Sequence, residues 1–310
     1  MPSSSIKIAL ADFHPTSNAT HCRMIRQLSA HFPIEFSDNP DYLFFSIFGT
    51  THRDPQFDRC VKILVLWENV RPDFSVCDYS LSFDYLNDPR NLRLPFYSDM
   101  NFYLEQEPNK SLIKPDNYNP THILSSKKKF CNFIYSNGWP IERIMFFEKL
   151  SEYKRVDSGG AVRNNLGFKV ENKRDFISPY KFTIAFENSS HPGYVTEKLI
   201  DPMFANSIPI YWGSPRVSEE FNPRSFINCH GYTSQQSAIE QVIKMDQDDS
   251  LYLEYLNAPW LHGNKPSPCC LPDYIIPFFQ MVFADKKPRT SRPAVTITIP
   301  GHDPGWKIIL

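Results

Sequence analysis

The sequence predicts an α/β protein with two doubly wound halves and a cleft between them. Short, nearly continuous apolar runs alternate along the chain with stretches whose apolar residues recur at helical spacing. Apolar runs of this length are typical of parallel strands that are covered on both faces. Two such series occur, and a polar stretch at residues 105–129 with three prolines separates them. Two separate series of strand–helix units indicate two α/β domains.

The first series opens with a strand at residues 6–10 and contains further strands at residues 42–48, 61–67 and 78–83. A helix is predicted between the first two strands, and its apolar face is made of Met24, Ile25, Leu28 and Phe32. We assign this series to a first domain at residues 1–124.

The polar stretch at residues 105–129 is interpreted as a linker or a crossing between domains. It ends in Lys127, Lys128 and Lys129. Such a basic triplet fits either an anionic ligand or a solvated run before a strand, and the solvated run is favoured.

The second series is assigned to a second domain at residues 125–285. Its strands are predicted at residues 130–135, 181–186 and 208–212. Its helices are expected to begin at Pro140, a favoured first helical residue, and at Glu197 after a Thr196 cap, with two more at residues 237–245 and 274–283. The tail at residues 286–310 is expected to wrap back on the first domain or to lack order.

The composition excludes several classes of protein. There are 33 Lys and Arg residues against 34 Asp and Glu residues, a balance that argues against a binder of nucleic-acid backbones. Only 11 residues are glycine, and neither of the glycine-rich phosphate-binding motifs is present. The seven cysteines are scattered, so reduced thiols are favoured over a disulfide framework. We also expect no membrane-spanning helix and no secretory signal.

The segment at residues 186–198 holds the highest density of candidate site residues. It runs from the carboxyl end of a strand, through a polar loop, to the start of a helix, which is where open α/β sheets bind ligands. Free N–H groups at a helix start favour an anion, and Lys198 in the first turn is unfavourable for the helix dipole unless an anion binds there. An ordinary capped first turn with a solvated lysine is an equally open interpretation.

Two further candidates follow strands in the same way. Glu68 ends an apolar strand, where partial burial would raise its pKa toward that of a general base; a simple ion pair with Arg71 is slightly favoured. Arg143 lies near the start of the Pro140 helix and would face a strand edge; by itself it is more often an exposed arginine.

Several segments, in order along the chain, resemble the family-10 α-1,3/1,4-fucosyltransferases, and the bacterial branch of that family is the better match. The donor-binding signature is matched by Phe186–Ser189, Tyr194–Lys198 and Ile208–Pro215. The resemblance covers residues 6–256 and includes four more segments: Glu68-Asn69 followed by Asp73-Phe74 and Asp78-Tyr79, Ser136-Asn137 with Arg143, Ser158–Gly160, and Asn222–Phe226.

The resemblance implies the GT-B fold, with two Rossmann-like domains facing a central cleft. It implies an inverting transfer of L-fucose from GDP-fucose, bound by the second domain, to the 3-hydroxyl of N-acetylglucosamine in a lactosamine-type glycan near the first. In the family's terms Glu68 is the base, Arg143 and Lys198 bind the GDP phosphates, Glu197 binds the ribose, and Asn188 and Tyr194 line the nucleotide. Alternatives are an α-1,4 linkage, another GT-B nucleotide-sugar transferase, or a binding protein without catalysis, which would not need the base.

No metal site is predicted. Asp246-Gln247-Asp248 has the spelling of a D-x-D metal-binding motif, but we interpret it as a chance occurrence. The resemblance implies chemistry without a required cofactor, although some family members are stimulated by Mn²⁺. A bacterial cytoplasmic location is expected, with at most peripheral association with the inner membrane. One departure from the family pattern is Pro202, which is expected to kink or end the helix that begins at Glu197.

Overall fold

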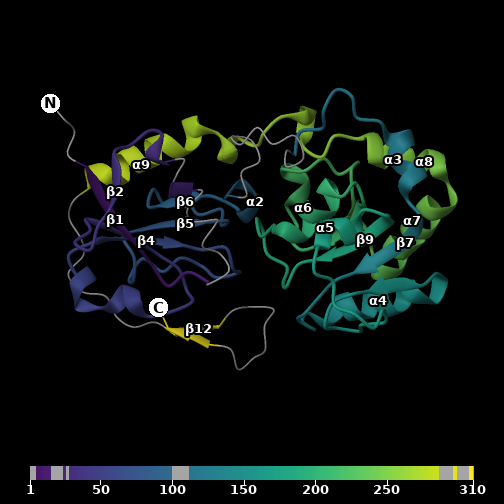
Figure 1. Ribbon diagram of the computed structural model, residues 1–310, viewed down its shortest axis with the longest axis horizontal. Helices are drawn as coiled ribbons and strands as arrows, with labels where there is room; N and C mark the ends of the chain where they lie inside the picture. Colours follow the sequence, from purple (N-terminus) through teal and green to yellow (C-terminus); the bar gives the residue numbers. More distant parts are fainter. Residues whose placement is uncertain are drawn as a thin grey trace. The chain divides into compact units, whose positions relative to one another are not determined.

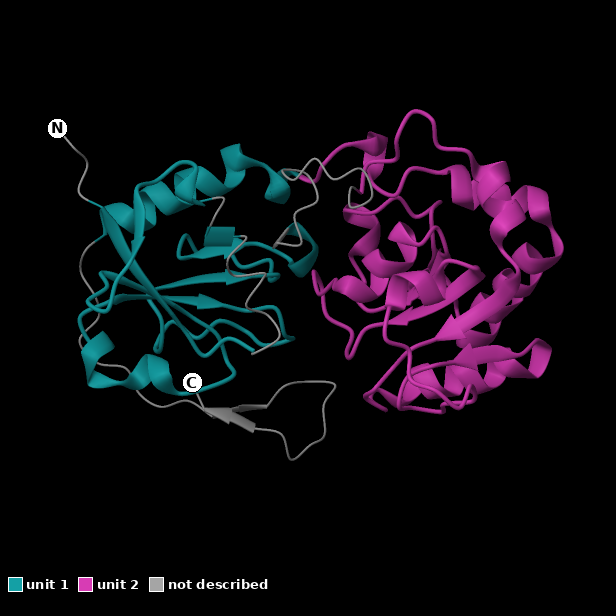
Figure 2. Ribbon diagram, viewed as in Figure 1, with its two compact units in different colours: residues 1–101, 268–310 teal, residues 102–267 magenta. Residues whose placement is uncertain are grey.

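A computed structural model describes residues 5–14, 24–25, 28–99 and 112–285, together with the backbone of two short strands in the tail (Figure 1). The chain forms two compact units (Figure 2). Unit 1 contains residues 1–101 and 268–310, and unit 2 contains residues 102–267.

Unit 1 is built on a parallel sheet, as the apolar runs predict, and the sheet has six strands, of which β2 and β6 were not predicted. The strand order is β2-β1-β3-β4-β5-β6. Every residue of β3, β4 and β5, three of the four interior strands, is buried, which confirms that this part of the sheet is covered on both faces. The bounds are β1 Ile6–Ala11, β2 Ile34–Phe36, β3 Tyr42–Phe45, β4 Val61–Val65, β5 Tyr79–Ser82 and β6 Asn91–Arg93. The short helices of this part are η2 Thr51–Arg53, η3 Pro55–Phe57 and α2 Phe96–Asp99.

One face of the unit 1 sheet is covered by α9 (Pro272–Ala284), which the sequence assigned to the second domain. Phe278, Phe279 and Val282 pack in one cluster with side chains of β1, β3, β4 and β5. Tyr42 and Tyr79 hold the end of this helix, because their hydroxyls donate to the carbonyl of Phe283 and to the carboxylate of Asp285, both within 2.8 Å. The predicted boundary at residue 285 is therefore wrong: the chain returns to unit 1 at about residue 268.

Unit 2 is built on a five-stranded parallel sheet with the order β11-β10-β9-β7-β8. Its strands are β7 Lys129–Phe133, β8 Val156–Ser158, β9 Tyr180–Phe186, β10 Ile208–Trp212 and β11 Ile227–Asn228. Its α-helices are α3 Pro120–Ser126, α4 Ile141–Tyr153, α5 Lys173–Ile177, α6 Glu197–Phe204, α7 Gln235–Gln247 and α8 Asp249–Asn257. Its short 3-10 helices are η4 Val217–Glu219, η5 Cys229–Gly231 and η6 His262–Asn264. The next one, η7 Pro268–Cys270, belongs to unit 1. Side chains of α4, α7 and α8 share one core cluster with the sheet, and α6 packs against β9 and β10.

The two helices that border the predicted site begin close to where the sequence places them. Thr196 is the N-cap of α6, as predicted, and its side-chain oxygen accepts from the backbone N–H of Lys198. Pro140 is the N-cap of α4 rather than its first residue. Pro202 lies inside α6, which ends two residues later at Phe204. No helix in the described part of the chain is both long enough and apolar enough to span a bilayer.

The stretch predicted as a linker is in part a packed portion of unit 2. Lys114 is buried, and its ammonium donates to the carbonyls of Leu256 and Ala258 at the end of α8, 2.6 Å from the latter. Lys127 is also buried and donates to the carbonyls of Ser178 and Ala205, so the expectation of a solvated basic triplet is wrong for this residue. Each lysine satisfies carbonyls at a helix end that have no partner within the helix.

Replacing Lys114 by methionine is expected to lower the free energy of unfolding by about 1.5–3 kcal/mol, because two buried carbonyls lose a charged donor. Urea unfolding measures the change. Lys128→Met is the control, since Lys128 is exposed and its backbone N–H, which the substitution keeps, donates to the carbonyl of Pro179. If the two variants unfold at the same urea concentration, Lys114 does not have the capping role given to it here.

The tail predicted to pack back on the first domain lies mostly outside the described residues. Within it, β12 (Thr296–Thr298) and β13 (Lys307–Ile309) pair in an antiparallel hairpin.

Candidate functional site

The two sheets begin with the same topology. In each, the second strand along the chain pairs with one side of the first strand, and the third strand pairs with the other side of the first. The switch point of unit 2 therefore lies between β7 and β9. A cavity of about 430 Å³ lies there, and it is lined by residues that follow β7, β8 and β9 together with α5 and α6. The principal lining residues are Tyr135–Asn137, Arg143, Gly159-Gly160, Lys169, Glu171, Lys173, Asn188, Glu197, Lys198 and Asp201.

Arg143 is wholly buried, which rules out the alternative of an exposed arginine. One terminal nitrogen, Nη2, donates to the carbonyl of Glu187 at 2.6 Å and to the side-chain oxygen of Asn188 at 3.0 Å. The guanidinium lies 4.2 Å from the ring centre of Tyr135. Its Nε has no hydrogen-bond partner among the described residues. Burial lowers the pKa of Arg143, and the carboxylates of Glu187 and Glu197 oppose this shift. A bound anion would stabilise such a cation.

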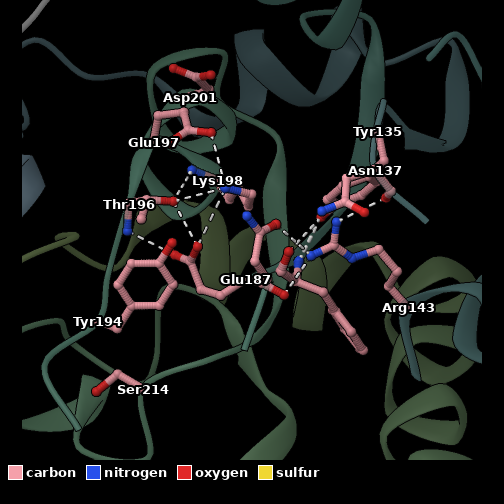
Figure 3. Close-up of polar contacts among 12 residues, drawn as sticks. Tyr135, Asn137, Arg143, Glu187, Tyr194, Thr196, Glu197, Lys198, Asp201 and Ser214 are labelled. Atoms are coloured by element: carbon pink, nitrogen blue, oxygen red, sulfur yellow. Dashed lines mark hydrogen bonds and ion pairs between the residues drawn. The ribbon is translucent and has the colours of Figure 1, made fainter. Parts of the chain in front are cut away.

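The second cation of the cavity, Lys198, lies at the start of α6 (Figure 3). Its ammonium is 3.2 Å from Oε1 of Glu197, 3.3 Å from Oγ1 of Thr196 and 3.6 Å from Oε2 of Glu187. The free N–H groups of the helix start add partial positive charge at the same place. The conflict between Lys198 and the helix dipole, noted from the sequence, is thus partly relieved by two carboxylates.

The carboxylate of Glu197 stays charged in this setting. Burial alone would raise its pKa, but the ammonium groups of Lys198 and Lys173 lower the pKa of Glu197 to about 2. One helical turn further along α6, Asp201 accepts from Lys173 at 3.2 Å. The cavity thus has cations from four residues and carboxylates from three, an arrangement that suits a ligand with phosphate and hydroxyl groups.

Asn188 and Tyr194, the two remaining residues predicted to line the nucleotide, lie in different surroundings. Asn188 lines the cavity and accepts from Arg143. Tyr194 is only 2% exposed and is not among the cavity-lining residues. Its carbonyl accepts from the hydroxyl of Tyr211 at 3.1 Å. Tyr194 is thus buried within its loop, and its predicted contact with the nucleotide stays a prediction.

Gly160 allows the loop after β8 to approach β7 closely. A Cβ at this position would lie 2.2 Å from the carbonyl oxygen and 2.4 Å from the amide nitrogen of Tyr135. The neighbouring atoms are backbone and cannot move aside at low cost, so only glycine fits here. Because Tyr135 packs under Arg143, this close approach also shapes the wall of the cavity.

Gly160→Ala is expected to lower the free energy of unfolding by about 1–3 kcal/mol, as overpacking of a tight contact usually does. Gly231→Ala is a matched control, because a Cβ there would meet no atom within 4 Å. Thermal and urea unfolding of the two variants measure the difference. If Gly160→Ala unfolds at the same urea concentration as the control, the close approach does not require glycine.

Glu68 lies in unit 1, in the loop that follows β4, and is half-buried. Its carbonyl accepts from the N–H of Val70 at 2.7 Å. Arg71, the alternative partner considered for it, donates to Asp84 at 2.7 Å and to Asn69. Glu68 is therefore at the carboxyl edge of the first sheet, as predicted, and the other predicted site residues lie in unit 2.

The D-x-D sequence of unit 2 has structural roles. Asp246 accepts from the hydroxyl of Tyr153 and from Lys154, both at 3.0 Å. Asp248 is the N-cap of α8 and accepts from two backbone N–H groups of its first turn. In the described ranges, no three His, Cys, Asp or Glu side chains are grouped so as to hold a metal ion.

Two family models match the chain, one for each unit. Residues 124–266 match the C-terminal region of glycosyltransferase family 10 (fucosyltransferase), and residues 8–103 match the N-terminal domain of alpha-(1,3)-fucosyltransferase FucT. The chain belongs to glycosyltransferase family 10. Residues 124–266 contain every predicted donor-site residue, and residues 8–103 contain Glu68, so the family-10 resemblance seen in the sequence is confirmed.

Relatives of this family-10 chain come from several organisms. The alpha-(1,3)-fucosyltransferase FucT of Helicobacter pylori is 32% identical over 74% of this chain and 54% of its own length. A 3-galactosyl-N-acetylglucosaminide 4-alpha-L-fucosyltransferase of Bos taurus is 32% identical over 46% of this chain and 39% of its own length. The chain thus spans about half the length, or less, of these relatives.

Solved structures support the same assignment. An alpha1,3-fucosyltransferase crystallised with GDP has a TM-score of 0.74 and 27% identity, over 94% of this chain and 95% of that one. The structure of an alpha1,3-fucosyltransferase with GDP-fucose has a TM-score of 0.73 and 28% identity, over 97% and 94% of the two chains. The two parallel α/β units of this family-10 chain are those of the GT-B fold, as expected.

Sequence reasoning missed several residues of the site. Tyr135, Lys169 and Lys173 line the cavity, and Glu187 lies directly behind it. Glu187 belongs to the recognised signature, so its buried carboxylate beside a capping threonine could have been noticed. Nothing in the sequence around Lys169 or Lys173 marks either residue, because a lysine in a polar stretch is usually solvated.

Proposed function

We propose that this protein is an inverting α-1,3-fucosyltransferase. It transfers L-fucose from GDP-fucose to the 3-hydroxyl of N-acetylglucosamine in a lactosamine-type glycan. The observation that carries the proposal is the pair of cations, Arg143 and Lys198, at the switch point of the unit 2 sheet. The family-10 relationship and the solved structures with GDP and GDP-fucose support it.

The proposed reaction exchanges one bond at the anomeric carbon for another with inversion. The bond from that carbon to the β-phosphate oxygen breaks, and GDP leaves with the electron pair. The acceptor oxygen forms the new bond from the opposite face and gives up its proton to Glu68. The sugar passes through an oxocarbenium-like state, so the largest change in charge occurs on the β-phosphate and on the sugar ring.

Arg143 and Lys198 are assigned to the leaving diphosphate. Arginine suits this role because its planar fork can donate two parallel hydrogen bonds to phosphate oxygens. Since negative charge on the β-phosphate grows as the bond breaks, both cations stabilise the transition state more than the ground state. Glu197 is assigned to ribose hydroxyls, which donate to a charged carboxylate, and Asn188 to the nucleotide next to Arg143.

No cofactor is part of this proposal, since Arg143 and Lys198 supply positive charge at the diphosphate. Assays with added Mn²⁺ and with a chelator test this point. A rate that depends wholly on Mn²⁺ would overturn the assignment of the charge to the two side chains alone.

Incubation of the protein with GDP-fucose and N-acetyllactosamine tests the function. Mass spectrometry is expected to detect the fucosylated trisaccharide, and linkage analysis is expected to place fucose on the 3-hydroxyl of N-acetylglucosamine. An acceptor whose free hydroxyl is at position 4 tests the α-1,4 alternative, which the bovine relative makes relevant. Binding of GDP-fucose without transfer to either acceptor would overturn the proposed acceptor class.

A bacterial cytoplasmic location, at most peripheral to the membrane, is part of the proposal. It rests on the likeness to the enzyme of Helicobacter pylori. Fractionation of cells that express the protein tests it, and resistance of membrane-bound protein to high salt would contradict it.

A further inference from the structure

Glu187, the first residue after β9, lies behind the cavity and between two of its cations, Arg143 and Lys198 (Figure 3). Its side chain is wholly buried and is not among the residues that line the cavity. Its N–H donates to the carbonyl of Trp212 at 2.8 Å, which continues the pairing of β9 with β10. The residue is thus fixed to the sheet rather than to a loose loop.

The carboxylate of Glu187 has charged or polar partners on both oxygens. Oε1 accepts from the backbone N–H of Thr196 and Oε2 from its hydroxyl, each at 2.7 Å. Oε2 also lies 3.6 Å from the ammonium of Lys198. Burial raises the pKa of Glu187, and the charge of Lys198 and the bonds from Thr196 oppose this shift. A buried carboxylate is costly unless it is hydrogen-bonded and paired with a positive charge, so moving Glu187 would also disturb Thr196 and Lys198.

The backbone of the same residue holds the other cation. The carbonyl of Glu187 accepts from Nη2 of Arg143 at 2.6 Å, and the side chain of the next residue, Asn188, accepts from the same nitrogen. Arg143 comes from α4 and Lys198 from α6, which are separate elements of unit 2. Glu187 therefore contacts both cations, one through its backbone and one through its carboxylate.

The space behind Glu187 leaves its side chain little freedom. A Cβ on Gly213 would lie 2.3 Å from Cγ of Glu187, so only glycine can follow β10 at this point. The side chain is held by packing on one side and by Thr196 on the other. Its carboxylate is thus held in one position, next to the more flexible side chain of Lys198.

We propose that Glu187 is a positioning residue, which sets the place of Lys198 for the diphosphate of the donor without touching the ligand. The inference rests on the proposed function, because it names a residue that prepares the same site. A lysine side chain has many rotamers, and fixing its ammonium before the ligand arrives lowers the entropy lost on binding. The same contact is kept as charge develops on the leaving group.

A double-mutant cycle with Glu187→Gln and Lys198→Met tests the proposal, with GDP affinity measured by calorimetry and kcat by fucose transfer. Glutamine keeps the size of the side chain and removes its charge. We expect Glu187→Gln to weaken GDP binding about tenfold when Lys198 is present, and by less than about twofold in the Lys198→Met background, as coupled neighbours do. Glu152→Gln is the control, since that carboxylate is exposed and pairs with Lys149 on α4.

A residue that only supported the fold would give another result. Its loss would lower the unfolding temperature and change GDP affinity equally in both backgrounds, and this additive outcome would overturn the proposal. Absence of fucose transfer by the unmodified protein would refute the proposed function but not this inference, because the cycle in GDP affinity still decides it. If the unmodified protein binds no GDP, the ligand-free crystal structure of Glu187→Gln decides. We expect the Lys198 ammonium to leave its place beside Thr196, and an unchanged position would overturn the proposal.

Discussion

Replacing Glu68 by glutamine is expected to lower kcat for fucose transfer by roughly 10²–10⁴-fold, the usual contribution of a general base. The acceptor hydroxyl must lose a proton as its oxygen attacks, and a glutamine amide cannot take that proton. The side chain keeps its size, and Glu68 lies at the carboxyl edge of the unit 1 sheet rather than in the unit 2 cavity. The affinity for GDP is therefore expected to stay nearly unchanged.

Steady-state kinetics with GDP-fucose and N-acetyllactosamine, together with calorimetric titration of GDP, measure the two effects of Glu68→Gln separately. Glu35→Gln is a suitable control, since Glu35 is an exposed residue of the edge strand β2 in the same unit. The assigned role is wrong if transfer survives in Glu68→Gln while GDP binding is lost. A shift of the unfolding temperature relative to the control shows how much of any change comes from stability.

Replacing Arg143 by lysine is expected to lower kcat by about 10²–10³-fold, which corresponds to ~2.7–4 kcal/mol of transition-state stabilisation. Lysine keeps a positive charge but not the planar fork, which here donates to Glu187 and Asn188 and packs on Tyr135. GDP affinity is expected to fall by less than kcat, because the charge on the β-phosphate is greatest as the bond to the sugar breaks.

Single-turnover kinetics of Arg143→Lys separate the bond-breaking step from product release, and calorimetry gives the affinity for GDP. Arg163→Lys is the matched control, because Arg163 is about half-exposed and pairs with Glu148 outside the cavity-lining set. Equal losses in kcat and in GDP affinity would mean that Arg143 binds donor and transition state alike. Such a result would remove its assigned role in the departure of GDP.

Much of the site follows from local rules that the sequence displays. Parallel strands present their carboxyl ends at one edge, so residues that follow β7 and β9 had to meet there. The helix start at Thr196 was predictable because a threonine side chain satisfies a free N–H of the first turn. These features depend on residues near one another in the chain, so they could be predicted from the sequence.

Other parts of the site depend on contacts between distant segments. Arg143 reads as an exposed arginine in the sequence, and its complete burial depends on Tyr135, Glu187 and Asn188. Tyr194 is buried, and its carbonyl accepts from the hydroxyl of Tyr211 on β10. The role inferred for Glu187 rests on two contacts, that of its carbonyl with Arg143 and that of its carboxylate with Lys198, and these two cations come from separate helices.

The sequence by itself determined the two series of buried parallel strands, the cap of α6 and the residues that could carry the chemistry. Spacing, capping and hydrophobic period are properties of short segments, so they can be read without knowing the rest of the chain. Only the tertiary structure decided that α9 packs on the unit 1 sheet, that Lys114 and Lys127 are buried, and that Glu187 links the two cations. An apolar helix face or a buried charge specifies only that it needs a partner; which distant surface supplies that partner is set by shape and charge complementarity across the folded chain.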